Sequence, residues 1–270
     1  MAERRRGIRP SRGTPAHPPG EVAPVKISFV IPAYNEEACI GACLESVMRA
    51  LAAGDYDAEV IVVNNASTDR TGERAGAFAG VRVVDEAVKG LVRARRAGLA
   101  AARGELIASI DADTMLTDGW LDVVVEAFRR DPRLVALSGP LIYFDMPAAS
   151  RALVWLFYAV AFVVHVFSQH VLHVGAMIQG GNFVARRSAL EAAGGYDTSI
   201  AFYGEDTDIA RRLSKVGRVK WTFRLPINSS GRRLKEEGVV KVGLRYALNF
   251  FWVILFGRPW TTTYTDVRSK

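Results

Sequence analysis

Between residues 25 and 110 the chain alternates short apolar runs with longer segments whose apolar residues recur at helical spacing. Strands that alternate with helices form a mainly parallel sheet. This alternation predicts an α/β fold with helices flanking the sheet. The four apolar runs that we expect to be strands are VKISFVI (25–31), AEVIVV (58–63), VRVV (81–84) and ELIASI (105–110).

Three helices are expected between these strands. In residues 35–51, Asn35 is placed to cap the helix, and two glutamates follow in its first turn. Residues 64–79 supply a turn and a helix, in which Asp69 is placed to cap. Residues 90–104 form a helix that ends on a glycine.

Polar clusters stand at the ends of three of the expected strands. They read PAYNE (32–36), NNASTD (64–69) and DAD (111–113). In open parallel sheets, ligands bind beyond the carboxyl ends of the strands. The three clusters therefore point toward one cleft.

The DAD cluster places two carboxylates one residue apart. Like charges this close repel unless a cation or a shared proton lies between them. The pair is therefore an exposed turn or a site for something positive. With fourteen aspartates in the chain, a D-x-D pattern is expected about once by chance. Asp55 and Asp57 form another such pair, in a stretch typical of a solvated turn.

Five segments occur in order that resemble the motifs of family 2 glycosyltransferases with the GT-A fold, over roughly residues 26–220. The resemblance implies a nucleotide-diphosphate sugar donor, a divalent metal (Mg²⁺ or Mn²⁺) and inversion at the sugar carbon. The segments are SFVIPAYNEE, VIVVNNASTDRT, KGLVRARRAGLAAARGELIASIDADT, QGGNFVARRSALEAAGGYD and YGEDTDIARRL.

By resemblance Asp113 is the metal ligand, and Asp111 contacts the ribose or a metal-bound water. The chemistry agrees, because a leaving diphosphate gains negative charge that a hard cation on carboxylates can stabilise. The alternative role for one aspartate is to cap the next helix, but Asp118 is better placed to do so.

The first motif implies that Pro32, Ala33, Tyr34 and Glu36 meet the base and ribose. Where the second motif commonly has an aspartate, this chain has Asn64. Uracil, guanine and thymine therefore all stay open as the donor base.

Asn65 can still bond a base edge. Lys89, Arg93 and Arg96 lie on or before one expected helix, and the two arginines share a face of it. They either reach the donor phosphates or form a solvated basic face.

An inverting transfer needs a carboxylate that takes the acceptor proton. By resemblance that base is Asp206, beside Glu205. Asp208 is expected instead to pair with Arg211 or Arg212 on a helix. In QGGN (179–182), Gly181 and Asn182 are expected to let the backbone approach the donor sugar.

Residues 152–185 contain no Asp, Glu, Lys or Arg, and the apolar part (about 152–178) is long enough to cross a bilayer. A single crossing would put Asp113 and Asp206 on opposite sides of the membrane. We therefore expect an interfacial or a buried helix, with a break at Gly175. His165, Gln169 and His173 would form one polar stripe along it.

Charge is concentrated near both ends of the chain. Residues 1–24 carry a net charge of +3 and residues 224–270 carry +6, of a total of +7, so the body between them carries −2. Basic ends suit an anionic membrane surface, nucleic acid or a soluble, flexible tail. The apolar run at 244–256 is too short to span a membrane, and basic and aromatic residues surround it.

Two departures from the family pattern occur in this last region. The Q-x-x-R-W motif of processive members is absent, which argues against a polysaccharide synthase. NSSGRR (228–233) has no histidine where some members place a metal ligand. The metal would then rest largely on Asp113, while Arg232 and Arg233 can neutralise the diphosphate or a lipid phosphate.

We expect a disordered basic tail (1–24), a GT-A domain (25–223) with a donor half (25–116) and an acceptor half (117–223), and a C-terminal extension of amphipathic or apolar helices (224–270). The expected function is metal-dependent, inverting transfer of a sugar to a hydroxyl or lipid-linked acceptor, at the cytoplasmic face of a membrane and without nucleic acid.

The alternatives are a polyprenyl-phosphate glycosyltransferase and a catalytically silent sugar-nucleotide scaffold. A nucleotidyltransferase would open with a glycine-rich basic loop, which PAYNEE is not. The oligomeric state, the sugar and the acceptor stay open.

Overall fold

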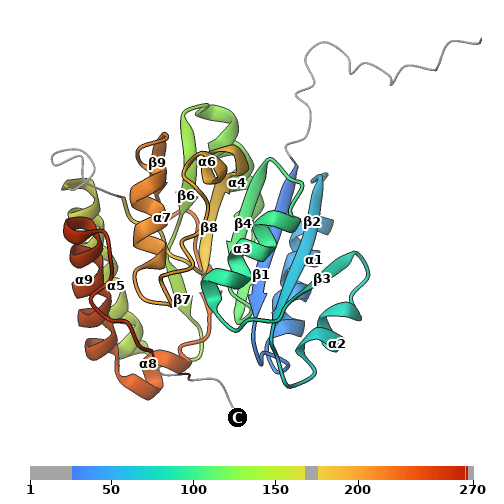
Figure 1. Cartoon of the computed structure of the whole chain (residues 1–270), viewed down its shortest axis with the longest axis horizontal. Coiled ribbons are helices and arrows are strands. Elements are labelled where there is room, and N and C mark those ends of the chain that lie inside the picture. Colours follow the sequence, from blue (N-terminus) through green and yellow to red (C-terminus); the bar gives the residue numbers. More distant parts are fainter. Residues whose placement is uncertain (1–25, 168–175, 265, 267–270) are drawn as a thin grey trace, which may run out of the picture.

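The computed structural model describes residues 26–167, 176–264 and 266 (Figure 1). Its centre is a seven-stranded sheet in the order β3-β2-β1-β4-β8-β6-β9, in which only β8 runs antiparallel to its neighbours. The predicted mainly parallel sheet is confirmed. The strands are β1 (Ile27–Ala33), β2 (Ala58–Asn65), β3 (Val81–Glu86), β4 (Leu106–Ile110), β6 (Leu134–Ser138), β8 (Asn182–Arg186) and β9 (Arg218–Trp221).

Helices cover both faces of this sheet (Figure 1). Alternate residues of β1 show the division, because Phe29 and Ile31 join one apolar core and Val30 joins the other. Helices α1 (Ile40–Ala52) and α4 (Trp120–Arg130) pack in the first core. The second core contains α3 (Leu91–Ala101), α6 (Arg187–Ala192) and α7 (Glu205–Leu213), and the short α2 (Thr71–Gly76) lies beside β3.

Two predicted helix caps are wrong. Helix α1 begins at Ile40, not at residue 35, and Asn35 has a positive φ of 50°. Its side-chain oxygen accepts a hydrogen bond from the Thr68 amide at 2.8 Å, so Asn35 joins two strand-end loops instead of capping. Asp118 is not the cap of α4 either, because left-handed Gly119 occupies that position. The N-cap position of α2 is Arg70, and Asp69, one residue earlier, accepts a hydrogen bond from the amide of Thr71, the first residue of α2, at 2.9 Å.

A small second sheet lies beside the central one, in the order β5-β10-β7. Its middle strand comes from the predicted C-terminal extension, and the amide of Ser230 just after it donates to the Asp113 carbonyl at 3.2 Å. The extension therefore contributes directly to the surroundings of the DAD cluster. The elements are β5 (Thr114–Leu116), β7 (Leu141–Tyr143) and β10 (Ile227–Ser229), followed by α8 (Arg232–Glu237).

Helices α5 (Ala148–Phe167) and α9 (Val239–Phe256) lie next to each other at one end of the molecule (Figure 1). Both are long and apolar enough to cross a membrane, by length and composition alone. Helix α5 is fastened to the domain by Tyr158, whose hydroxyl accepts from the Leu141 amide at 3.0 Å, and by buried His165, which accepts from the Met177 amide at 3.1 Å.

The remaining predictions for this region and for the tail lie outside the described residues. They concern Gln169, His173, the break at Gly175 and residues 1–24.

Candidate functional site

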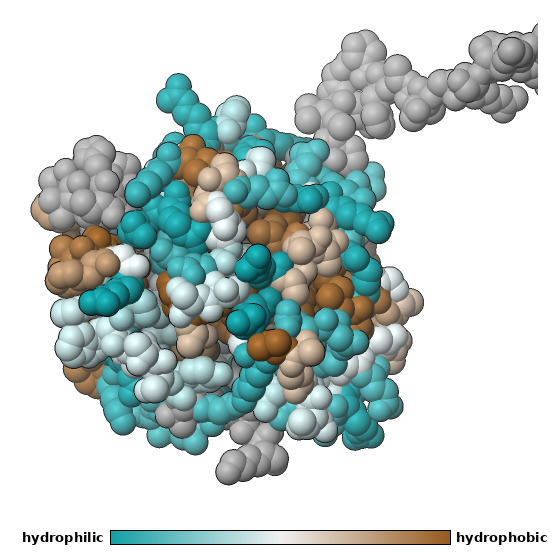
Figure 2. Space-filling view, in the orientation of Figure 1, coloured by the Kyte–Doolittle hydropathy of each residue, from teal (hydrophilic) through white to brown (hydrophobic). Residues whose placement is uncertain are grey.

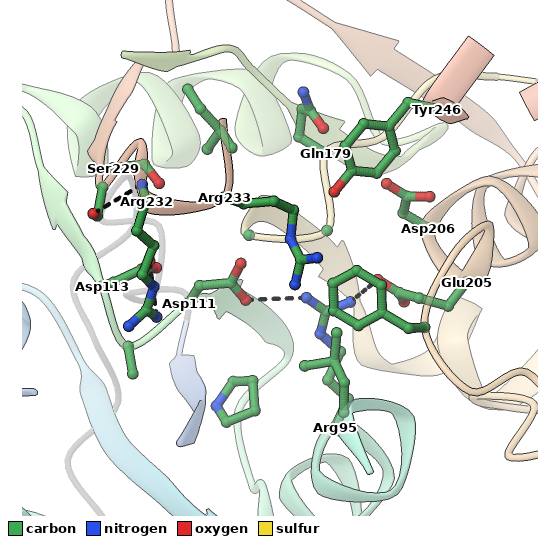
Figure 3. A pocket seen from close by; sticks show the side chains of 18 of the residues that line it. Arg95, Asp111, Asp113, Gln179, Glu205, Asp206, Ser229, Arg232, Arg233 and Tyr246 are labelled. Carbon is green, nitrogen blue, oxygen red and sulfur yellow. Dashed lines mark hydrogen bonds and ion pairs between the residues drawn. The ribbon is translucent and has the colours of Figure 1, made fainter. Parts of the chain in front are cut away.

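The principal cleft opens at the carboxyl ends of β1 and β4, where the order of strands along the sheet reverses (Figure 3). Open α/β sheets bind ligands at this kind of position. The residues that line the cleft include Pro32, Glu36, Asp111 and Asp113 from segment 25–116, Gly181, Glu205 and Asp206 from segment 117–223, and Arg232 and Arg233 from α8.

A buried arginine joins the two halves of this cleft. Arg95, with 1% of its side chain exposed, donates to the Asp111 carboxylate at 3.2 Å and forms a closer ion pair with Glu205. Figure 3 shows its guanidinium between the two carboxylates. Its charge offsets the repulsion between acids that would otherwise face each other across the cleft.

Sequence reasoning missed Arg95 and named its neighbours Arg93 and Arg96, which are both exposed. Helical spacing was the available signal. Arg95 lies three residues after Val92 and four before Leu99, which are both buried against the sheet. It therefore belongs to the inward face of α3.

The glycines of QGGN (179–182) lie against the same charged groups. A methyl group on Gly181 would come within 2.4 Å of the Asp111 carboxylate, and one on Gly180 would come within 2.6 Å of Glu205. The backbone here approaches Asp111 and Glu205 too closely for any side chain. Asn182, by contrast, is fully buried and donates to the carbonyls of Pro140 and Leu225, so it holds the fold and does not line the cleft.

Glu205 and Asp206 lie in the first turn of α7, directly after Gly204, whose φ of +80° suits glycine. Burial raises the pKa of Asp206, while the Thr207 amide opposes that shift by donating to the carboxylate. Burial also raises the pKa of Glu205, against the opposing effect of Arg95. A carboxylate with a raised pKa that faces a cleft has the properties of a general base.

Asp208 points elsewhere, as predicted. Its two carboxylate oxygens pair with Arg211 at 3.2 Å and Arg212 at 2.7 Å, and it is buried. This confirms the predicted pairing and leaves Asp206, and not Asp208, as the aspartate of this helix that lines the cleft.

Arg232 makes the contact with Asp113. One nitrogen of its guanidinium, Nη2, lies 3.0 Å from Asp113 and also pairs closely with Glu36. Arg233 instead donates to Glu237 at 2.9 Å and lies over the ring of Phe202. Arg232 therefore forms an ion pair with the DAD cluster, whereas Arg233 forms one within α8.

A second, smaller pocket adjoins the first beside β1. Pro32, Ala33 and Tyr34 line it, and the amine of Lys89 lies 3.8 Å above the Tyr34 ring. Two aromatic residues that the sequence analysis did not single out, Phe202 and Tyr264, complete it and stack on each other at 4.8 Å. Flat rings around one pocket are suited to holding a planar base.

Asn65 also lines this second pocket, but its amide group already has partners. The nitrogen donates to the carbonyls of Glu86 and Val88, and the oxygen accepts from the Gly90 amide at 2.7 Å. Asn65 thus shapes the loop that carries Lys89.

The donor set fits a divalent cation that is only partly bound by protein. Asp113 and Glu36 converge on one position, now taken by the Arg232 nitrogen, and Asp111 lies beside them. Among the described residues, no three His, Cys, Asp or Glu side chains gather closely enough to hold a metal by themselves. Mg²⁺ is commonly held by one or two carboxylates, with phosphate oxygens and water completing its shell.

Comparison with known proteins gives one family. The sequence model described as "Glycosyl transferase family 2" matches residues 28–194. The chain is 30% identical over 207 residues to "Probable glycosyltransferase YdaM" of Bacillus subtilis, covering 71% of this chain and 47% of that protein. It is 35% identical over 112 residues to the dodecaprenyl-phosphate galacturonate synthase of Rhizobium johnstonii, covering 39% of this chain and 32% of that protein. The chain thus spans less than half the length of these relatives.

Solved structures share the fold. Glucosyl-3-phosphoglycerate synthase of Mycobacterium tuberculosis, in complex with Mn²⁺, UDP-glucose and phosphoglyceric acid, superposes with a TM-score of 0.59 at 23% identity, over 90% of this chain and 86% of that one. The mannosyltransferase of Pyrobaculum calidifontis, in complex with GDP-mannose and Mn²⁺, gives 0.60 at 22% identity, over 77% and 57%. The predicted GT-A fold is confirmed.

Proposed function

Because this chain belongs to glycosyl transferase family 2, we propose that it is a metal-dependent, inverting glycosyltransferase that moves a sugar from a nucleotide-diphosphate donor to a hydroxyl or lipid-linked acceptor. The observation that carries the proposal is the meeting of Asp111 and Asp113 with Glu205 and Asp206 in one cleft, across Arg95. Neighbours of the same fold are solved with Mn²⁺ and nucleotide sugars.

In this proposal, each of the two pockets holds a different part of the nucleotide-sugar donor. The base would lie among the rings of Tyr34, Phe202 and Tyr264, and the diphosphate would lie beside Asp113 and Arg232. The sugar would then face Gly181 and Asp206. A divalent ion on Asp113, when bound, would offset the charge of the leaving diphosphate.

Asp206 would act as the base. Its carboxylate would take the proton of the acceptor hydroxyl while that oxygen attacks the anomeric carbon and the bond from carbon to diphosphate breaks. One displacement of this kind inverts the sugar carbon. Arg95 would position Asp111 and Glu205 without touching the reacting atoms.

A lipid-phosphate acceptor is the second candidate, favoured by the similarity to a protein named for a dodecaprenyl-phosphate product. A phosphate oxygen already carries negative charge, so it scarcely needs a base. Asp206→Asn separates the two cases. With a hydroxyl acceptor we expect turnover to fall by about 10²–10⁴-fold, and with a phosphate acceptor we expect it to stay near that of the wild type.

We also propose that the protein works at the cytoplasmic face of a membrane. The outer surface of α5 and α9 supports the contact with a membrane. Each helix exposes apolar side chains at the same spacing on one side, and part of this surface is brown at the left margin of Figure 2. Exposed Lys241 and Arg258 stand at the two ends of α9. The exposed residues are Leu156, Val160, Val163 and Phe167 on α5, and Leu244, Leu248, Phe251 and Leu255 on α9.

We propose that these helices lie in the membrane surface and do not cross it. Asp113 precedes α5 and Asp206 follows it, yet both line one cleft. Helix α5 is also tied to the domain near its middle and near its end, through Tyr158 and His165. Amphipathic helices with basic flanks bind anionic lipid surfaces in this orientation.

A donor panel tests the enzyme proposal. The protein is mixed with UDP-, GDP- or dTDP-sugars and Mn²⁺, Mg²⁺ or EDTA, with and without lipid vesicles, and donor binding heat and nucleoside diphosphate release are measured. We expect metal-dependent binding and slow hydrolysis of donors with one base, both lost in Asp113→Ala. Binding without any turnover would indicate the silent scaffold. No binding by folded protein, even with vesicles, would overturn the proposal.

A further inference from the structure

The Arg232 guanidinium takes the place of a small cation in the donor cleft. A single nitrogen of it, Nη2, contacts both Asp113, at 3.0 Å, and Glu36. Figure 3 shows the side chain reaching from α8 down to Asp113. The two carboxylates come from different elements and converge on that nitrogen.

The start of α8 holds Arg232 in this position. Asp145 accepts hydrogen bonds from the Gly231 amide at 2.6 Å and the Ser230 hydroxyl at 3.0 Å, and it pairs with Lys235 at 3.0 Å. Because Arg232 is the first residue of this clamped helix, its backbone has a fixed position above the DAD cluster.

The two carboxylates need a positive partner. The Glu36 side chain is 3% exposed and that of Asp113 is 13% exposed, so water screens neither well. Close carboxylates in such surroundings are stabilised by a cation between them. A divalent ion bound to Asp113 would stand next to the guanidinium charge, and at this range their repulsion is strong.

We propose that Arg232 and a divalent metal compete for Asp113, so that the protein without donor holds the guanidinium and binds metal weakly. The inference rests on the proposed function only in taking Asp113 as the metal ligand. It assigns a role to an arginine of NSSGRR (228–233), the segment in which some members of the family are expected to carry a histidine ligand. A nucleotide diphosphate would relieve the competition, because its oxygens are partners for both Arg232 and the metal.

Mn²⁺ binding tests the competition without any turnover. The electron paramagnetic resonance signal of free Mn²⁺ is followed during titration of the wild type, Arg232→Gln and Arg233→Gln, all without nucleotide. We expect Arg232→Gln to bind Mn²⁺ about tenfold more tightly or better, because one charge-assisted contact to Asp113 is removed. Arg233→Gln removes an equal charge one residue along, from an arginine that pairs with Glu237, and should gain much less Mn²⁺ affinity than Arg232→Gln.

Two further variants make the result specific. Adding Asp113→Asn to Arg232→Gln should abolish the gain. If circular dichroism shows that Arg232→Gln is unfolded, Arg232→Met, which keeps the unbranched apolar stem of the side chain without its charge, replaces it. Equal Mn²⁺ affinity in the wild type and in a folded Arg232 variant would overturn the proposal.

Repeating the Mn²⁺ titration with added nucleotide tests this inference and the proposed function separately. Adding UDP or GDP should raise the Mn²⁺ affinity of the wild type more than that of Arg232→Gln. A wild type that gains nothing with any nucleoside diphosphate would refute the proposed donor site, whereas the nucleotide-free comparison alone decides the competition.

Discussion

Arg95 is a full positive charge held almost entirely away from water, and its two carboxylate partners explain how the fold tolerates it. Removing it would leave Glu205 buried with no opposite charge. We expect Arg95→Ala to lower the free energy of unfolding by about 3–5 kcal/mol, measured by urea denaturation. Arg96→Ala, at the exposed neighbour on the same helix, should change it by less than about 0.5 kcal/mol. Equal effects of the two would contradict the role of Arg95.

Asp206 contributes to the dependence of stability on pH, because burial raises its pKa above the ordinary 3.8. The folded state then holds this proton more tightly than the unfolded state, so the contribution of Asp206 to stability is lost as pH rises through the raised pKa. We expect Asp206→Asn to melt at a higher temperature than the wild type at neutral pH, with the advantage gone below about pH 3.8.

Asp208→Asn is the matched control for that melting series. It removes ion pairs to Arg211 and Arg212, whereas Asp206→Asn removes a carboxylate whose charged form burial disfavours. It should therefore lower the melting temperature at neutral pH. A destabilised Asp206→Asn would show that its carboxylate is favourably placed and would argue against its activation as a base.

At the scale of single residues, the sequence predicted which charged side chains belong to the site better than it predicted the contacts that each side chain makes. Asp111, Asp113, Glu205 and Asp206 do line one cleft. The end of β4 brings the first two there, and the first turn of α7 brings the other two. Asn182 lies outside the cleft because its amide is taken up by buried carbonyls. Such partners lie far away in the sequence, so no local sequence pattern predicts them.

The glycines in the loop before β8 allow its backbone to lie close to the carboxylates of Asp111 and Glu205. Because a methyl group on Gly181 would lie 2.4 Å from the Asp111 carboxylate, we expect Gly181→Ala to cost about 1–3 kcal/mol of stability and to weaken donor binding, measured by denaturation and calorimetry. Gly41→Ala has no atom within 4 Å of the new methyl and lies in α1, so it should stabilise by about 0.5–1 kcal/mol. A harmless Gly181→Ala would mean that Asp111 moves freely.

The strands and helices that could be predicted from the sequence were those whose apolar residues form a run or a regular spacing over several positions. Strands β1 to β4 fall where their apolar runs do, and α3 follows its helical spacing. The start of α1 was wrong because Asn35 bonds across to Thr68. Strands β5, β7 and β10 have only three residues each. Strands this short are defined by the strands with which they pair, because three residues are too few to show an alternating apolar pattern.

In the part of the chain that the structure describes, α5 and α9 present an apolar side, and the whole chain carries a net charge of +7. We expect it to sediment with vesicles that contain anionic lipid, less so at high salt. Leu156→Glu together with Leu248→Glu should reduce the bound fraction by about tenfold or more. Ala100→Glu, at an exposed site on α3, adds one acid away from this side and should have little effect. Unchanged binding of the double variant would contradict the proposed surface.

The middle strand of the small sheet has a consequence for the order in which the site can form during synthesis. Strand β10 separates β5 from β7, and Arg232 follows it by a few residues. A growing chain that has reached residue 223 already contains every carboxylate of the cleft, but not the strand that joins β5 to β7 or the guanidinium that meets Asp113 and Glu36. The ribosome therefore delivers these acids and Arg95 before Arg232, so Asp113 and Glu36 gain their arginine partner only when α8 has been made.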